Sequence, residues 1–112
     1  MTSPPPLTSA EFQVLLALAD GEKHGYAIGK EVTARTDGQV QLRAATLYTV
    51  IKRLLANGFI DESAARPDRE LDDERRRYYR LTPQGRKAAE AEAVRLEATA
   101  RQARAKLRLR RA

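Results

Sequence analysis

The chain has 112 residues, no cysteine and a formal net charge of +6. A chain of this length builds one modest hydrophobic core rather than a core around a roomy active site, and without cysteine it can form neither disulfides nor thiolate metal sites. No run reaches the roughly 18 apolar residues of a membrane helix, so we expect no membrane partner.

The first predicted element is a flexible arm over residues 1–7, because its prolines cannot donate helix hydrogen bonds. The arm lacks the charged leader and apolar stretch of an export signal, which favours a cytoplasmic protein. Thr8 and Glu11 then form the T-x-x-E pattern of a capping box, which predicts the start of a helix that stops at Gly21. The apolar stripe expected on this helix comprises Phe12, Leu15, Leu16 and Ala19.

Two further helices are predicted next. One starts within residues 24–26 and runs to about residue 36, and the other covers residues 43–57 and ends before Gly58. The helix over 43–57 has apolar residues at helical spacing, which predicts a buried face made of Leu47, Val50, Ile51, Leu54 and Leu55. The polar residues threaded between them are Thr46, Tyr48, Thr49, Lys52 and Arg53.

After Gly58 the hydrophobic period changes to two, and residues 59–64 and 75–82 are each predicted to form a strand. The charged segment 66–74 joins them, so the two strands form a hairpin with a long loop. Arg66, Arg69 and Arg76 could contact a phosphate backbone there, whereas the acidic residues of the loop would repel it.

A long helix is predicted to follow, because Thr82 and Pro83 supply an N-cap and a proline at the first helical position. Its small residues repeat in steps of four and three, which is a heptad seam suited to dimerisation: Ala89, Ala93, Leu96, Ala100, Ala103 and Leu107. Packing of the same helix on its own domain is the alternative.

The net positive charge lies at the C-terminal end of the chain. Residues 83–112 hold 9 Lys or Arg against 3 Asp or Glu, while residues 1–82 hold 12 of each. This basic end matches a helix macrodipole, so net charge alone does not locate a binding face.

The order of these elements predicts a mostly α fold with a small β-hairpin, namely a winged helix-turn-helix with a long C-terminal helix. We divide the chain into the arm 1–7, a winged-helix DNA-binding domain 8–82 and a dimerisation helix 83–112. The third helix would enter the major groove, with Arg43 forking to guanine and Lys52 and Arg53 contacting phosphate. The alternative is that this face is merely solvated, with Tyr48 packed on the hairpin.

Catalytic chemistry is poorly supported by the sequence, and we expect no enzyme, no metal and no cofactor. His24 is the single histidine, so it lacks the partners of a metal set and is read as structural. The acidic group at residues 72–74 lies beside arginines, which disfavours a cation site.

The chain resembles the PadR family of transcriptional regulators, specifically its short members with one C-terminal helix. The resemblance covers residues 7–112. It rests on four segments in order: His24-Gly25-Tyr26-x-Ile28, Thr46-Leu47-Tyr48 with Lys52-Arg53-Leu54, Asn57-Gly58-Phe59-Ile60, and Arg77-Tyr78-Tyr79-x-Leu81-Thr82-x-x-Gly85.

The resemblance implies a homodimeric repressor that binds a palindromic operator in double-stranded DNA and releases it in response to an effector, which could be a small molecule. It places Thr46, Tyr48 and Lys52 at the DNA and Tyr26 behind the recognition helix. We also expect Phe12 and Leu16 at the dimer interface, since the N-terminal and C-terminal helices of two chains would pack together. The alternative function is a winged-helix protein-interaction module that does not bind DNA.

Overall fold

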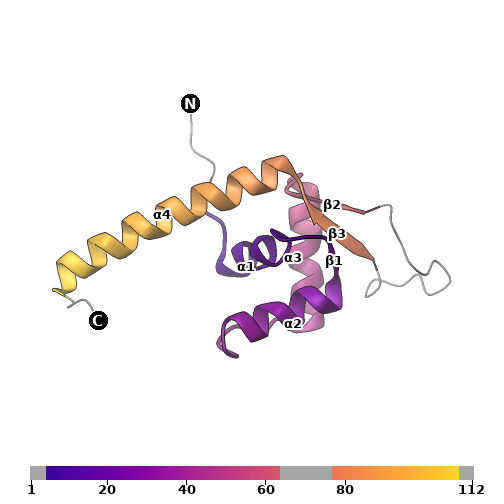
Figure 1. Ribbon diagram of the computed structural model, residues 1–112, viewed down its shortest axis with the longest axis horizontal. Coiled ribbons are helices and arrows are strands. Elements are labelled where there is room, and N and C mark those ends of the chain that lie inside the picture. The colour runs from indigo at the N-terminus through magenta and orange to yellow at the C-terminus, as the bar shows by residue number, and fades with distance from the viewer. Residues whose placement is uncertain (1–4, 64–76, 109–112) are drawn as a thin grey trace.

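The computed structural model describes residues 5–63 and 77–108. Its elements follow one another as α1 (Ser9–Ala17), β1 (Lys23–His24), α2 (Gly25–Arg35), α3 (Ala44–Ala56), β2 (Ile60–Glu62), β3 (Tyr78–Leu81) and α4 (Pro83–Leu107). Three short helices pack together beside a small sheet, and α4 extends away from them on the opposite side (Figure 1). The predicted fold class, mostly helical with a small β wing and a long last helix, is confirmed.

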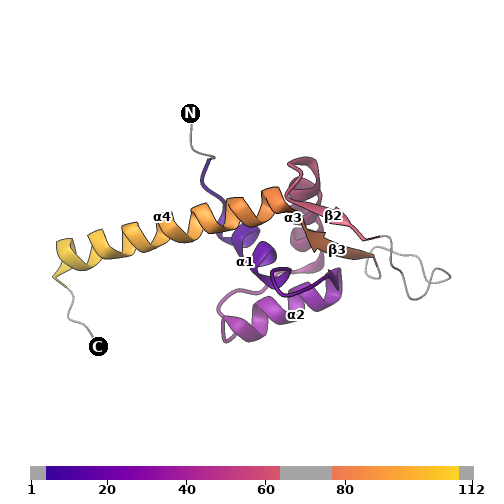
Figure 2. The ribbon, with the colours of Figure 1, turned by 45° about the horizontal axis from the view of Figure 1, so that its top comes forward.

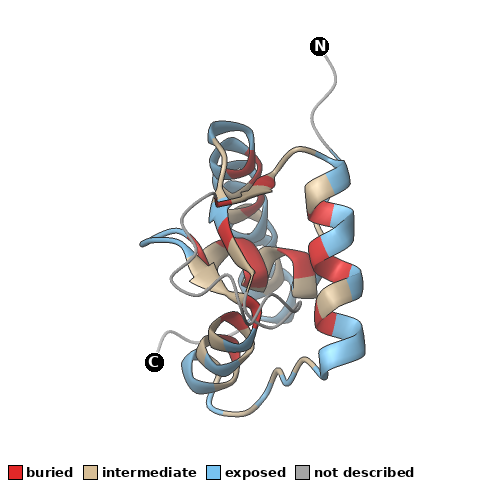
Figure 3. Cartoon of the chain, turned by 90° about the vertical axis from the view of Figure 1, so that its right-hand side faces the viewer, coloured by how far each residue is buried: buried red, intermediate tan, exposed pale blue. Residues whose placement is uncertain are grey.

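The core lies where α1, α2 and α3 face one another and the sheet. Figure 3 shows the buried residues on the sides of the helices that point inward. The buried apolar side chains of these helices are Val14, Leu15, Ala17, Leu18, Ile28, Val32, Leu47, Val50, Ile51 and Leu54. Ile60 and Tyr79 close the core from the sheet.

The capping box that starts α1 is confirmed, because the Thr8 hydroxyl accepts from the Glu11 amide at 3.1 Å and the Glu11 carboxylate accepts from the Thr8 amide at 2.8 Å. The predicted apolar stripe of this helix is wrong in part. Its buried side is centred on Val14, Leu15 and Leu18. Of the expected stripe, Phe12 and Leu16 are half-buried and Ala19 is exposed, because the neighbouring stripe is the one that faces α2 and α3.

The sheet has three strands, one more than the predicted hairpin. Its order is β1-β3-β2 and all pairs are antiparallel, with Lys23 opposite Tyr79 and Ile60 opposite Leu81. β1 is only two residues long, too short to show a period of two in the sequence. His24 ends β1 and also caps α2, since its Nδ1 accepts from the Ala27 amide at 3.1 Å.

The start of α4 is locked to the junction between α3 and β2. The Thr82 hydroxyl accepts from the Gly85 amide at 3.0 Å and donates to the Gly58 carbonyl at 2.7 Å. A Cβ on Gly85 would lie 1.9 Å from the Phe59 carbonyl oxygen, so only glycine permits this approach of the two backbones. Gly58 has a φ of +77° and is the predicted residue that follows the end of α3.

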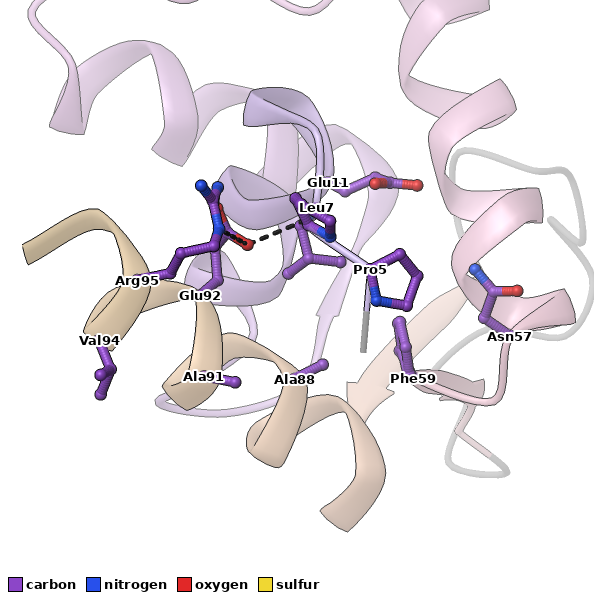
Figure 4. A pocket seen from close by; sticks show the side chains of 11 residues that line it. Pro5, Leu7, Glu11, Asn57, Phe59, Ala88, Ala91, Glu92, Val94 and Arg95 are labelled. Carbon is purple, nitrogen blue, oxygen red and sulfur yellow. Dashed lines mark hydrogen bonds and ion pairs between the residues drawn. The ribbon is translucent and has the colours of Figure 1, made fainter. Parts of the chain in front are cut away.

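The N-terminal arm is attached to α4. The Leu7 amide donates to the Glu92 carboxylate at 3.0 Å, across 85 positions of the sequence, and Figure 4 shows this bond beside a groove of about 540 Å³. Glu92 is buried and ion-paired with Arg95. The hydrogen bond from Arg95 lowers the pKa of the Glu92 carboxyl below its ordinary value.

We predict that this attachment makes stability depend on pH. A carboxyl whose pKa is lowered by folding stabilises the folded state above its unfolded pKa of about 4.3, and that contribution is lost as the pH falls through the folded pKa. Glu92→Gln should therefore lower the free energy of unfolding at pH 7, and its difference from the parent protein should shrink as the solution is acidified. Urea denaturation at several pH values measures this, with Glu97→Gln on the exposed side of α4 as the control. A difference that stays constant with pH would contradict the prediction.

Candidate nucleic-acid interface

Helix α3 has one face in the core and one face in solvent. Leu47, Val50, Ile51 and Leu54 seat it against the other helices. The exposed residues at its start and along its outer face are Arg43, Ala44, Ala45, Thr46, Thr49, Lys52, Arg53 and Ala56. The predicted inner face is therefore confirmed for Leu47, Val50, Ile51 and Leu54, whereas Leu55, predicted to be buried with them, is half-buried against the core.

The central part of the outer face is polar, and few acidic side chains pair with its basic residues. Thr46 and Lys52 are exposed, and within residues 5–63 and 77–108 neither Lys52 nor Arg43 forms an ion pair. Thr49 is exposed as well, but its hydroxyl donates to the Ala45 carbonyl at 2.9 Å. Because the hydroxyl donates this bond, its oxygen can still accept a hydrogen bond, and the exposed side chain also offers a methyl group that can touch a thymine methyl.

Arg53 is placed differently from Lys52. Its Nη1 lies 3.6 Å from Oε2 of Glu11, whose side chain is buried. Glu11 is the residue that completes the capping box of α1. The guanidinium therefore joins the end of α3 to the start of α1, and its charge is partly balanced within the chain.

Tyr48 packs on the start of α2. A Cβ on Gly25 would lie 2.6 Å from the Tyr48 hydroxyl oxygen and 2.9 Å from its ring, so the tyrosine ring covers the first turn of α2 at a place where a side chain cannot fit. Tyr26, the predicted support of this helix, is 59% exposed. Its ring stacks on His24 and carries the Lys30 ammonium at 5.2 Å from the ring centroid.

The wing strands carry paired charges. Arg80 donates to the Asp61 carboxylate at 2.7 Å, and this bond raises the pKa of Arg80. Arg77 lies 3.9 Å from Glu62. The predicted phosphate contacts Arg66, Arg69 and Arg76 lie outside the described residues.

The residues predicted for dimerisation fall into two groups. Phe12, Leu16, Ala89 and Ala93 are half-buried within the domain, and Ala89 packs against the core. Leu96 is 41% exposed and Leu107 67% exposed, with Ala100 and Ala103 between them on the part of α4 that extends beyond the other helices (Figure 2). Val94 is 65% exposed and is an apolar surface residue that the heptad pattern misses.

Other kinds of site are not evident in the part of the chain that the structure describes. It contains no group of three or more His, Asp or Glu residues that could hold a metal ion. None of its helices combines the length and apolarity needed to cross a membrane.

Comparison with known proteins gives a family. Residues 14–91 match the model of the family described as Transcriptional regulator PadR-like family. A protein of Lysinibacillus sphaericus that bears only the name Uncharacterized protein X is 33% identical over 73 residues. That match covers 65% of this chain and 64% of the relative, so the chain spans slightly less than two thirds of the relative's length.

Solved structures are similar over most of the chain. A transcriptional regulator from Clostridium thermocellum has a TM-score of 0.68 and 31% identity, over 80% of this chain and 83% of that one. A PadR family transcription regulator from Clostridium difficile has a TM-score of 0.73 and 21% identity, over 89% and 99%. PadR of Bacillus subtilis, in complex with operator DNA, has a TM-score of 0.63 and 21% identity, over 75% and 46%. The last two similarities concern the fold.

We predict that Tyr48 and Gly25 are energetically coupled. Gly25→Ala should lower the free energy of unfolding by about 1–3 kcal/mol, because the new methyl group overpacks the tyrosine ring. In a Tyr48→Ala background the same substitution should cost far less, giving a coupling energy of about 0.5–3 kcal/mol in a double-mutant cycle.

Gly29→Ala is the matched control for this cycle, since its Cβ would make only an ordinary contact at 3.5 Å with Leu47. It should be neutral or stabilising. Additive effects of Gly25→Ala and Tyr48→Ala, measured by urea denaturation, would show that the ring does not depend on this glycine.

Proposed function

This chain belongs to the PadR-like family of transcriptional regulators, and from that premise we propose that it is a homodimeric repressor that binds an inverted repeat in double-stranded DNA through α3. The family consists of regulators rather than enzymes, in agreement with the expectation from the sequence. The observation that carries the proposal is the outer face of α3, which exposes Lys52 and threonine side chains while the inner face is fixed in the core.

The roles on this face follow from the position of each side chain. Lys52 lies in the second half of α3 and suits a phosphate, as a flexible point charge. Arg43 precedes the first turn, which normally enters the major groove first, and its planar fork matches the O6 and N7 atoms of guanine. Thr46 and Thr49 offer methyl groups for thymine. Arg53 is held toward Glu11 and contributes less, and Tyr48 mainly positions the helix.

Dimerisation would use the seam on α4 together with α1. Leu96 and Leu107 leave apolar surface exposed in the single chain. Ala100 and Ala103 allow the backbones of two such helices to approach closely. A two-fold axis through this seam presents two copies of α3 to one side of a duplex, so that the half-sites are separated by about 10 bp or a multiple of it.

Repression would be steric. Phosphate contacts fix the register of the dimer, a few side chains of α3 select the bases, and the occupied operator blocks polymerase. If the protein represses its own gene, footprinting should show a protected palindrome in the DNA upstream of that gene.

We predict that substitutions on α3 separate phosphate from base contacts. Lys52→Ala should weaken binding to all duplexes and reduce the slope of log affinity against log salt by about 1, whereas Arg43→Ala should cost about 1–3 kcal/mol and relax the preference for one base pair. Gel shifts at two salt concentrations measure both, on the sequence selected by the protein from random DNA. Lys87→Ala, an exposed lysine on α4, is the matched control and should change neither quantity. Binding that does not respond to salt would favour the protein-interaction module instead.

We also predict that a charge in the seam separates the subunits. Leu96→Glu should convert the dimer to a monomer, because a carboxylate would be buried without a partner between the two helices. Gln102→Glu, on the opposite side of α4 and exposed, should leave the dimer intact. Sedimentation equilibrium at micromolar concentration measures the mass, and a monomeric parent protein would contradict the role of the seam.

A further inference from the structure

His24 is the residue at which the small sheet and α2 meet. It lies opposite Tyr78 in the pairing of β1 with β3, and it is also the N-cap of α2. Its Nδ1 atom accepts a hydrogen bond from the Ala27 amide at 3.1 Å. We propose that this cap is sensitive to protons: neutral His24 holds the first turn of α2, whereas protonated His24 releases that turn and weakens DNA binding by α3.

The hydrogen bond to Ala27 determines which form of the ring the fold requires. An imidazole nitrogen accepts a hydrogen bond only while it carries no proton, so the proton of the neutral ring lies on Nε2. A second proton would place an N–H group on Nδ1, facing the N–H group of Ala27, and two donors cannot bond to each other. Histidine changes charge between about pH 5 and 8, whereas the usual capping side chains remain acceptors throughout this range.

The surroundings of His24 provide no counter-ion for a protonated ring, since within residues 5–63 and 77–108 it forms no ion pair. On α2 it stacks on the Tyr26 ring, with 6.3 Å between centroids, and that ring already carries the Lys30 ammonium at 5.2 Å. On β3 it meets the Tyr78 ring edge to face at 5.4 Å. The basic residues that flank His24 and Tyr78 are themselves ion-paired, namely Lys23 with Asp20 and Glu31, and Arg77 with Glu62. A protonated ring would also lie at the positive end of the α2 dipole.

The first turn of α2 is the surface on which α3 rests. The Tyr48 ring covers Gly25, where a Cβ would lie 2.6 Å from the tyrosine oxygen, and Gly25 directly follows His24. Loss of the cap therefore loosens the support of α3. The effect on DNA rests on the proposed function, because binding through Lys52 and its neighbours would require the supported helix. The apparent affinity then falls with the fraction of chains in which the first turn of α2 is formed.

The expected sign separates this mechanism from a simple effect of charge. His24 is the single histidine of the chain, so acidification from about pH 7.5 to about pH 5.5 adds its positive charge. A phosphate backbone attracts added positive charge, and electrostatics alone would therefore strengthen DNA binding in acid. Release of the cap predicts weaker binding in acid.

The test without DNA follows the Ala27 amide by NMR in the ¹⁵N-labelled full chain over this pH range. We expect the protection of that amide against hydrogen exchange to fall about fivefold, as the loss of one cap of ordinary strength predicts. The midpoint of this change should coincide with the titration of the His24 ring. His24→Asn is the matched variant, because asparagine is a strong N-cap that does not titrate, and its Ala27 protection should not depend on pH. His24→Ala should show the low protection at both ends of the range.

Unchanged protection of Ala27 on protonation of the His24 ring would overturn the inference, as would a His24→Asn variant that keeps the pH dependence of the parent chain. The measurement on the parent chain is sufficient by itself, so it decides the question even where a variant fails to fold.

Fluorescence anisotropy with the duplex selected from random DNA measures the consequence for binding at constant salt. Between about pH 7.5 and about pH 5.5 the affinity of the parent chain should fall about fivefold, while His24→Asn should bind equally at both values. Parent binding that strengthens or stays constant in acid would overturn the connection between the cap and DNA. A chain that binds no duplex at either pH would remove the proposed function, whereas the Ala27 measurement would still decide whether protonation releases the cap.

Discussion

The contact between the backbone of Phe59 and Gly85 is the constraint on which the arrangement of the molecule depends. At this point the end of α3, the first residues of the wing and the start of α4 meet, and the absence of a side chain at Gly85 allows them to meet. The Thr82 hydroxyl reinforces the junction by bonding to Gly58 and to Gly85 simultaneously. Because the junction joins three elements, the direction of α4 is fixed relative to the helix that we assign to DNA.

Two further contacts determine which residues α3 exposes. Tyr48 rests on Gly25 at one border of the helix, and Arg53 approaches Glu11 at the other. Both side chains are long and polar enough to contact DNA, yet each contact within the chain helps to orient the helix. Fewer polar side chains of α3 are therefore left to contact DNA than its sequence implies. Within the described ranges, Lys52 and Arg43 are the charged residues of the outer face of α3 that form no ion pair.

Local features could be predicted from the sequence, while features that depend on packing could not. The caps at Thr8 and Thr82 and the inner face of α3 follow from short-range patterns, and the structure confirms them. β1 escapes notice because two residues show no periodicity. The buried side of α1 is ambiguous because the helix is apolar on two adjacent stripes, and only its contacts with α2 and α3 decide between them. The contact of Tyr48 with Gly25 joins positions too far apart for any helical pattern to reveal.

The rigid attachment of α4 has a geometric consequence for a pair of chains. A helix of 25 residues is about 37 Å long at a rise of ~1.5 Å per residue. When one end is fixed to the α3 junction, α4 behaves as a lever arm, and a change of about 5° in the angle between two paired helices displaces the far end by about 3 Å. Residues such as Ala100 and Ala103, which lie on α4 beyond its junction with α3, would then set the distance between half-sites through the angle at which the two helices cross.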